Sequence, residues 1–481
     1  MDYSLQLLMT LPELVLAVGS IVLMLVAAWG GHQSTKLVSW AAIAVLIGAG
    51  IALMGPASSG GSAFDGLYRA DMFAAFSKAL IYVAAAVSIL IAPRFFEHTS
   101  GDDLRPEYPV LILLSTAGMG MMVSAGDMLT LYVGLEMLSL SSYVLASFMR
   151  RDARSAEAGL KYFVLGALAS GILLYGISLV YGFSGTTLFD GIASAYAGER
   201  SIGLLFGLVF VFAGLAFKMS AVPFHMWTPD VYEGAPTPVT AFFASAPKVA
   251  AVALAVRVAI EAMGPALHDW RQIVIFASLA SIILGAVAAI GQTNVKRLLA
   301  YSSINNVGFA LIGLAAGTEQ GVSGVLTYMA IYVVMTIGSF LVVLQMRGPD
   351  GEPIEDIASL AGMSRTRPGL AAALAIFMFS LAGIPPLLGF FAKLAVFVAA
   401  VQAGLIVFAV IGAAASTIGA YYYLRIVKTM YFDEPAAAFH GKPGVIEGGL
   451  IALTAAVISP LGWVLLLPLG AWTTLAARAL F

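Results

Sequence analysis

Two kinds of residue that most proteins use freely are scarce in this chain: cysteine and charged side chains. None of the 481 residues is cysteine, which excludes disulfide bonds, thiolate-bound zinc and iron–sulfur clusters held by cysteine. Only 10% of the residues are Asp, Glu, Lys or Arg, against roughly 25% in an ordinary soluble domain. So few charges cannot cover the surface of a soluble protein of this length.

Several binding motifs are also missing. The five histidines are far apart in sequence and include no pair at positions i and i+4 that suits a metal or haem. There is no G-x-G-x-x-G or P-loop sequence, no basic tract, and the net charge is −2. We therefore expect no cofactor, nucleotide or metal in this chain, no redox centre within it, and no nucleic-acid partner.

Apolar residues are abundant instead: 60% of the chain is hydrophobic and the mean hydropathy is +0.96. A transmembrane helix needs ~20 mostly apolar residues to cross ~30 Å of hydrocarbon. The sequence therefore predicts an all-α integral membrane protein with about 14 transmembrane helices. The expected spans are 9–29, 37–55, 72–92, 108–125, 129–149, 160–182, 203–222, 239–260, 272–291, 298–316, 322–346, 369–399, 404–424 and 446–467.

Lys and Arg are concentrated in every second loop, and basic loops face the cytoplasm. The loops poor in basic residues contain only Arg69, Arg200, Arg271 and Arg478. With an even number of spans, this bias predicts both termini on the outer, periplasmic side of a bacterial inner membrane. The loop 228–238 does not fit the pattern, since it is acidic although it belongs to the basic side.

Six charged residues fall inside the expected spans: Glu136, Lys218, Lys248, Lys393, Lys78 and Arg257. A charge at mid-membrane costs at least ~2.5–3.5 kcal/mol, so such residues usually face protein or water and serve an ion pathway. The first four are too deep to reach the interface, and we interpret them as a proton relay, with structural ion pairs as the alternative. Lys78 and Arg257 lie near the outer ends of their spans, and for them we favour snorkelling or structural pairing over a role in the relay.

Prolines interrupt two of the expected spans, the seventh at Pro223 and the twelfth at Pro385-Pro386. Broken helices in corresponding halves are typical of transporters built from inverted repeats. Val222-Pro223 and Ile384-Pro385 are 162 residues apart, an offset of five spans. We therefore predict spans 1–3 in residues 1–107, one five-helix repeat in 108–262, an inverted second repeat in 263–430, and span 14 in 431–481. His225, beside the first break, could relay a proton or simply pack there.

Three stretches carry a resemblance to a known family: Lys218–Phe242, Asn294–Ser303 and Gly383–Lys393. They resemble the antiporter-like subunits of respiratory complex I, the proton-translocating NADH:quinone oxidoreductase, and the likeness extends over nearly the whole chain. Within that superfamily the chain is similar to the subunit N branch, because Lys393 stands where subunit M usually has Glu. No segment follows the fourteenth span to form the lateral helix of subunit L. Asn306 is a departure, since many relatives have a histidine there.

The resemblance implies a mechanism that the residues alone do not show. Electrons would pass from NADH through FMN and iron–sulfur clusters in partner subunits to quinone, and the membrane arm would move protons. Glu136 and Lys218 would form a switchable pair, Lys248 would be the central carrier, and Lys393 would gate exchange with one side. The implied partners are the other complex I subunits, the bilayer and protons.

Other functions remain open at this point. The same fold and charges suit a subunit of a multi-subunit cation/proton antiporter or of a membrane-bound hydrogenase. A stand-alone solute transporter would need a substrate-shaped site, for which the sequence has no signature. A scaffold subunit with vestigial charges would need its lysines only for assembly.

Overall fold

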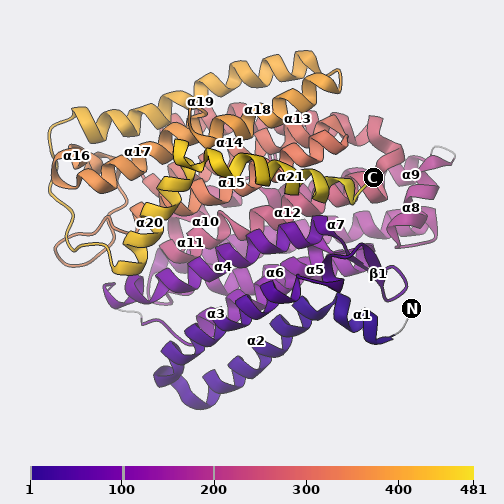
Figure 1. Cartoon of the computed structure of the whole chain (residues 1–481), viewed down its shortest axis with the longest axis horizontal. Coiled ribbons are helices and arrows are strands. Elements are labelled where there is room, and N and C mark those ends of the chain that lie inside the picture. The colour runs from indigo at the N-terminus through magenta and orange to yellow at the C-terminus, as the bar shows by residue number, and fades with distance from the viewer. Residues whose placement is uncertain (1–2, 100–102, 199–200) are drawn as a thin grey trace.

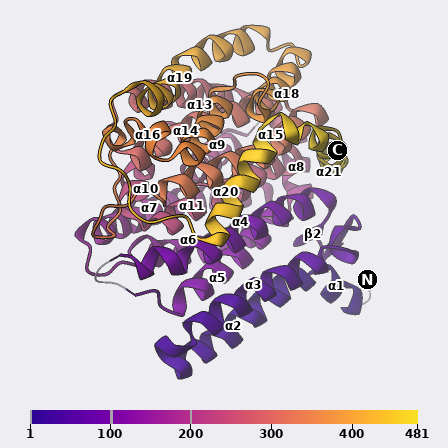
Figure 2. The ribbon, with the colours of Figure 1, turned by 60° about the vertical axis from the view of Figure 1, so that its left-hand side comes forward.

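The computed structural model describes residues 3–99, 103–198 and 201–481, so that Arg200 lies outside the described residues. Its helices run nearly side by side, and the chain progresses from α2 and α3 at one edge to α18 and α19 at the other (Figure 1). The last two helices, α20 and α21, return across this series to pack on α15 and α4 (Figure 2). The first described residues and the last helix lie at the same end of the bundle.

The first part of the chain contains α1 (Tyr3–Met9), α2 (Leu11–Gly30), α3 (Thr35–Ala52), β1 (Gly61–Ala63), β2 (Tyr68–Ala70) and α4 (Met72–Glu97). The middle part contains α5 (Glu107–Val123), α6 (Met128–Ala146), α7 (Ala153–Ser184), α8 (Phe189–Ala197), α9 (Ile202–Met219), α10 (Trp227–Gly234), α11 (Thr237–Phe243) and α12 (Ala246–Arg257). The last part contains α13 (Leu267–Ile290), α14 (Val295–Ala316), α15 (Glu319–Val343), α16 (Met363–Thr366), α17 (Pro368–Ala382), α18 (Leu388–Gln402), α19 (Ile406–Phe432), α20 (Val445–Ile458) and α21 (Leu466–Arg478).

The predicted helical membrane fold is confirmed in its class. Within the described ranges, 11 helical segments are long and apolar enough to cross a membrane, and four shorter apolar helices accompany them. The number of 14 spans stays a prediction. One departure from an all-α chain is the hairpin β1–β2, in which Gly61 pairs with Ala70 and the turn falls at Asp65-Gly66. Both turn residues have a positive φ, as a tight hairpin turn requires.

Polar residues at the helix ends explain several of the boundaries. Asp127 accepts hydrogen bonds from the first backbone N–H groups of α6, and Asn294 does the same for α14. Gly317 ends α14 in the left-handed conformation that glycine adopts without strain. These caps fix where each helix enters the membrane and therefore the depth of the charged residues within it.

The three most enclosed segments lie at the centre of the bundle. All of the most apolar window in 237–262 is buried, as are 94% of the window in α14 and 89% of that in α15, whereas only 28% is buried in 11–52. These central segments contain Lys248, Asn306 and Tyr328. The polar residues of interest are thus surrounded by protein rather than by lipid.

Glycines bring two helix pairs into close contact. A Cβ at Gly118 in α5 would lie 2.6 Å from the carbonyl oxygen of Gly134 in α6, and a Cβ at Gly134 would lie 2.8 Å from that of Gly118. Likewise a Cβ at Gly285 in α13 would lie 2.8 Å from the backbone nitrogen of Asn305, and one at Gly308 in α14 would lie 2.8 Å from the carbonyl oxygen of Ser278. Small residues at such contacts are what allow membrane helices to approach closely.

The helix interruptions are more numerous than the sequence suggested. Both expected breaks are present, because α9 ends at Met219 before Pro223 and α17 ends at Ala382 before Pro385. The eighth span, expected to be continuous, is also broken: α11 stops before Ala244, and α12 restarts with Pro247 in its first turn. The fourteenth also differs, since α20 ends at Ser459-Pro460 and α21 follows. In each case a proline stands where the regular helix restarts or stops.

The acidic loop on the basic side is explained by its partners. Asp230 pairs with Lys161 (2.8 Å) and Arg297 (2.6 Å), and Glu233 pairs with Arg297 (3.0 Å). The loop before α16 adds Glu355, which lies 2.9 Å from Lys296 and accepts a hydrogen bond from Asn294. The acids therefore neutralise basic residues at the helix ends and join α7, α10 and α14 to the loop that contains Glu355.

We expect Glu355→Gln to destabilise the protein by about 3 kcal/mol, because it leaves the buried Lys296 ammonium without a carboxylate. Thermal unfolding followed by tryptophan fluorescence in detergent measures the effect. Glu434→Gln is the matched control, since the Glu434 side chain is 95% exposed and lies 3.9 Å from Arg365. Equal midpoints for the two variants would contradict the assignment.

The pH dependence of this difference has a definite sign. Burial raises the pKa of Glu355, but Lys296 and Asn294 outweigh burial and hold the pKa below its ordinary value. The stabilising contribution is therefore complete above the unfolded value of about 4.3 and is lost as pH falls through the folded-state value. The gap between wild type and Glu355→Gln should be constant near neutral pH and narrow below about pH 4.

Candidate functional site

The deep basic residues predicted from the sequence are buried in the structure. Lys248 is 1% exposed, and Lys218 and Lys393 are buried almost as fully. Lys78 and Arg257 are buried completely. What separates these residues is the kind of partner that each one has.

Lys78 and Arg257 each have a carboxylate partner. Lys78 Nζ lies 2.6 Å from Glu13 and donates a hydrogen bond to the hydroxyl of Tyr68 at 2.7 Å. Arg257 lies 2.8 Å from Asp71 and 2.6 Å from Glu261, and it also donates to the carbonyl oxygen of Val123. These contacts support structural ion pairing for Lys78 and Arg257, as favoured from the sequence.

Glu13 is an acid whose place the sequence reasoning missed. It lies in the first turn of α2, is buried, and fits beside Gly120, where a Cβ would lie 2.6 Å from its Oε1 atom. Glu13 is thus a second buried acid, close to the start of a span. The sequence does show Glu13 as an acid within a long apolar run, but nothing in it indicates that the partner of Glu13 is Lys78, 65 residues further along the chain.

Lys248 has neutral partners only. Its Nζ donates to the carbonyl oxygen of Met219 at 3.0 Å and to the hydroxyl of Ser220, the residues at which α9 ends. Its ammonium also lies 5.3 Å from the centre of the Trp227 ring. Among the described residues, no carboxylate lies within 4.0 Å of it. The break in the seventh span thus provides the acceptors for the lysine of the eighth.

Lys393 is held in the same manner at the second break. Its Nζ donates to the carbonyl oxygen of Ala382, the last residue of α17, at 3.0 Å and to Ser416 in α19 at 3.1 Å. It lies 4.3 Å from the centre of the Phe309 ring. The ion pairs found among the described residues do not include Lys393.

Lys218 and Glu136 are near each other but do not form a direct ion pair within 4.0 Å, as far as the described residues show. Lys218 instead donates to Ser139 at 2.5 Å, one turn along α6 from Glu136, and remains within electrostatic range of Glu136. Glu136 is half-buried, and its Oε1 atom is buried without a hydrogen-bond partner. The two groups can therefore associate or separate through a side-chain movement of Lys218.

His225 lies in the break after α9 and is half-buried, and its Nδ1 atom has no hydrogen-bond partner. Pro223 and Met226 on either side of it are exposed on the isolated chain. The structure thus places His225 at the chain surface near the break.

A polar cluster on α14 lies between Lys248 and Lys393. Asn306 accepts a hydrogen bond from Tyr328 at 2.7 Å and donates to the Ser302 carbonyl oxygen and to Tyr423. Ser302 and Tyr423 are 2.5 Å apart, and Tyr332 donates to Ser303 at 2.8 Å. At one end of the cluster, Ser303 lies next to Tyr232, whose ring centre is 5.9 Å from Lys248 Nζ. Beyond the other end, the ring of Phe309 in α14 contacts Lys393.

Most members of this cluster could not be found from the sequence. Ser302, Ser303, Asn305 and Asn306 of α14 are all buried. Tyr328, Tyr332 and Tyr423 come from α15 and α19 and have no local motif. Among the described residues, no group of three or more His, Asp or Glu could hold a metal ion.

Comparison with known proteins places this geometry in a family. Residues 125–419 match the family described as NADH:quinone oxidoreductase/Mrp antiporter, TM. NADH-quinone oxidoreductase subunit N of Rhizorhabdus wittichii is 67% identical, with 100% of each chain covered, and that of Erythrobacter litoralis is 58% identical, with 100% of this chain and 99% of the relative covered.

Two solved structures have the same fold. A chain of respiratory complex I from Thermus thermophilus with bound aureothin is 33% identical, with a TM-score of 0.79, and the match covers 94% of this chain and 98% of that one. A chain of the Mrp complex from Dietzia sp. DQ12-45-1b has a TM-score of 0.85 at 23% identity, covers 99% and 98%, and shows the fold alone. On these matches, the chain belongs to the subunit N family of NADH-quinone oxidoreductases, within the NADH:quinone oxidoreductase/Mrp antiporter family.

Proposed function

We propose that this chain is the proton-translocating membrane subunit of an NADH:quinone oxidoreductase. Electron transfer from NADH to quinone would take place in partner subunits that hold FMN and iron–sulfur clusters. Membership in the subunit N family supports this assignment. The observation that carries the mechanism is that Lys218, Lys248 and Lys393 are buried without a carboxylate within 4.0 Å in the described part of the chain.

The partners of a buried base decide what it can do. A buried ammonium costs several kcal/mol, and a carboxylate in good geometry compensates much of that cost. Lys78 and Arg257 have such compensation and remain fixed charges. Carbonyl and hydroxyl acceptors compensate less, and a hydroxyl also bonds the neutral amine. Small changes nearby can therefore alter the proton occupancy of Lys218, Lys248 and Lys393.

The proposed relay begins at Glu136 and Lys218. In it, the Lys218 ammonium moves between the hydroxyl of Ser139, to which it now donates, and the carboxylate of Glu136. Lys248 is the central carrier, the polar cluster of α14 leads towards Lys393, and Lys393 exchanges protons with one side. His225 is a further candidate at the first break. Because Ser303 and Phe309 are six residues apart, α14 spans about 9 Å between the surroundings of the two lysines.

Two local similarities support the inverted repeat, which we place at residues 108–262 and 263–430. Both broken spans end in a left-handed residue, Ser220 or Gly383, and a proline follows within three residues. The glycine-mediated contact of α5 with α6 has a counterpart five spans later in α13 and α14. The basic-loop bias supports placing both termini on the periplasmic side of the bacterial inner membrane.

A role in a multi-subunit cation/proton antiporter has less support. The chain of the Mrp complex and a chain of the membrane-bound sulfane sulfur reductase have the same fold at 23% and 24% identity. The full-length similarity to subunit N sequences is far higher. Neighbouring membrane-arm subunits of complex I are therefore the proposed partners.

Replacing the central carrier should abolish pumping. We expect Lys248→Met to reduce protons moved per NADH to less than about a tenth of wild type, since Lys248 is the lysine whose Nζ donates to the carbonyl oxygen at which α9 ends. The measurement is proton uptake by inside-out vesicles that contain the assembled complex. Lys428→Met, on the exposed part of α19, is the control. Unchanged pumping by Lys248→Met would rule out its role.

Removing the acceptor of Lys218 should give a smaller loss. We expect Ser139→Ala to lower pumping a few-fold, because Lys218 loses the hydrogen bond that holds it away from Glu136, a contact of roughly 1.5 kcal/mol. Ser141→Ala is matched to it, since Ser141 bonds only a carbonyl of its own helix. Equal rates in the two variants, at equal assembly, would contradict the proposed partner exchange.

The paired lysine should behave differently. We expect Lys78→Met to lower the amount of assembled complex, because Glu13 would be left buried and unpaired at a cost of about 3–5 kcal/mol. The double variant Glu13→Gln/Lys78→Met should recover part of the loss. Native gels measure assembly, and protons per NADH should stay at the wild-type value in the complex that forms. Normal assembly with lost pumping would instead put Lys78 in the relay.

A further inference from the structure

A groove lies between α17 and α20, open at the end of the bundle where both helices begin. Its volume is about 690 Å³. Arg367 and Lys442 stand at its mouth, and small side chains such as Ala372 and Ala373 of α17 and Gly448 and Ala452 of α20 form its walls. Residue 455 of α20, about 15 Å along the helix from its start, still lines it. A groove of this length reaches about half the ~30 Å of a hydrocarbon layer.

The mouth of the groove is positive. The Arg367 side chain donates a hydrogen bond to the carbonyl oxygen of Phe439 at 2.6 Å. The backbone of Lys442 is held by Arg94, which donates to the carbonyl oxygen of Lys442. Neither side chain has a carboxylate within 4.0 Å among the described residues. No Asp or Glu is found among the described residues that line the groove. Its two cations are therefore available to an anion.

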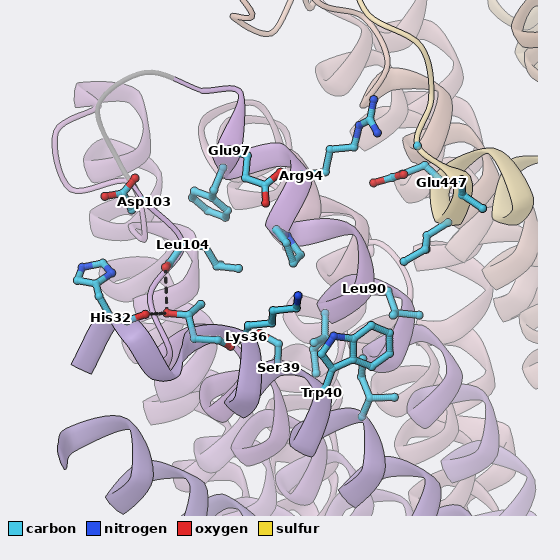
Figure 3. A pocket seen from close by; sticks show the side chains of 18 of the residues that line it. His32, Lys36, Ser39, Trp40, Leu90, Arg94, Glu97, Asp103, Leu104 and Glu447 are labelled. Atoms are coloured by element: carbon cyan, nitrogen blue, oxygen red, sulfur yellow. Dashed lines mark hydrogen bonds between the residues drawn. The ribbon is translucent and has the colours of Figure 1, made fainter. Parts of the chain in front are cut away.

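A second cavity, lined by residues of α3, α4 and the start of α20, provides a contrast (Figure 3). It has a volume of about 700 Å³ and contains both signs of charge, with Lys36 and Arg94 beside Glu97, Asp103 and Glu447. Arg94 and Glu447 both lie against Gly444. The acid in the first turn of α20 therefore faces Arg94 and that cavity, and leaves the groove beside α17 positive.

We propose that the groove binds one anionic phospholipid of the bilayer. Its phosphodiester lies between Arg367 and Lys442, and an acyl chain extends along α17 and α20 into the membrane. The groove opens on the side that carries most Lys and Arg residues, where basic pockets between helices bind anionic headgroups. The first turns of α17 and α20 have no side-chain caps, so their free N–H groups add to the attraction. This inference is independent of the relay, because lipid binding requires no turnover.

The test uses the intact complex in nanodiscs of phosphatidylethanolamine, titrated with phosphatidylglycerol and followed by native mass spectrometry. We expect Arg367→Gln/Lys442→Gln to weaken binding of phosphatidylglycerol roughly 30-fold, since each basic residue near the surface contributes about a factor of five. Arg365→Gln/Lys428→Gln removes two exposed charges on the same side but outside the groove, and should bind as wild type does. Equal affinities for the two double variants would overturn the proposal.

A second variant distinguishes a lipid from free phosphate. Ala452→Phe fills the apolar part of the groove and leaves both cations in place. It should weaken phosphatidylglycerol binding at least tenfold, and inorganic phosphate should not compete in the wild type. Unchanged lipid binding by Ala452→Phe, or full competition by inorganic phosphate, would show that the site takes no acyl chain and would overturn the proposal.

Discussion

The cost of burying a positive charge away from any carboxylate is the constraint on which the rest of the structure depends. For Lys248 and Lys393, hydrogen bonds to the backbone carbonyl oxygens of Met219 and Ala382 offset part of this cost. In a continuous helix these carbonyls would accept bonds from the next turn. The helix breaks leave them free at the depth of the lysines, so that each break and its lysine form one structural unit.

For the other buried bases, Lys78 and Arg257, carboxylate partners offset the cost, and these ion pairs connect separate helices. Glu13 of α2 reaches Lys78 of α4, and Asp71 at the start of α4 reaches Arg257 of α12. The first pair joins two helices of the N-terminal part, and the second joins that part to α12. At the ends that carry most of the basic residues, Glu355 pairs with Lys296 and Asp230 pairs with Arg297, both at the start of α14. Fixed pairs at both ends therefore surround a middle layer in which the lysines have neutral partners.

The sequence predicted those features that depend on a residue and its near neighbours. Apolar runs predicted the helices, Pro223 and Pro385 predicted two breaks, and deep lysines stood out against an apolar background. The break before Lys248 was missed because Pro247 lies in the first turn of a helix, where proline is well tolerated. The pair Glu13–Lys78 and the tyrosines around Asn306 depend on tertiary packing, to which no local pattern responds.

Asn306 constrains how a proton could pass along α14. An amide side chain donates through Nδ2 and accepts through Oδ1, as it does with Ser302 and Tyr328, but it does not take up a proton near neutral pH. The hydroxyls of Ser302 and Tyr423 can donate and accept alike, and they are 2.5 Å apart. In the proposed relay a proton on this path would therefore move by exchange between hydroxyls or ordered water, with no site of its own on α14. Charge would reside on Lys248 or on Lys393, and each lysine would respond to the other directly. A histidine at position 306 would instead provide an intermediate site, so the asparagine makes the coupling between the two lysines depend on their own protonation alone.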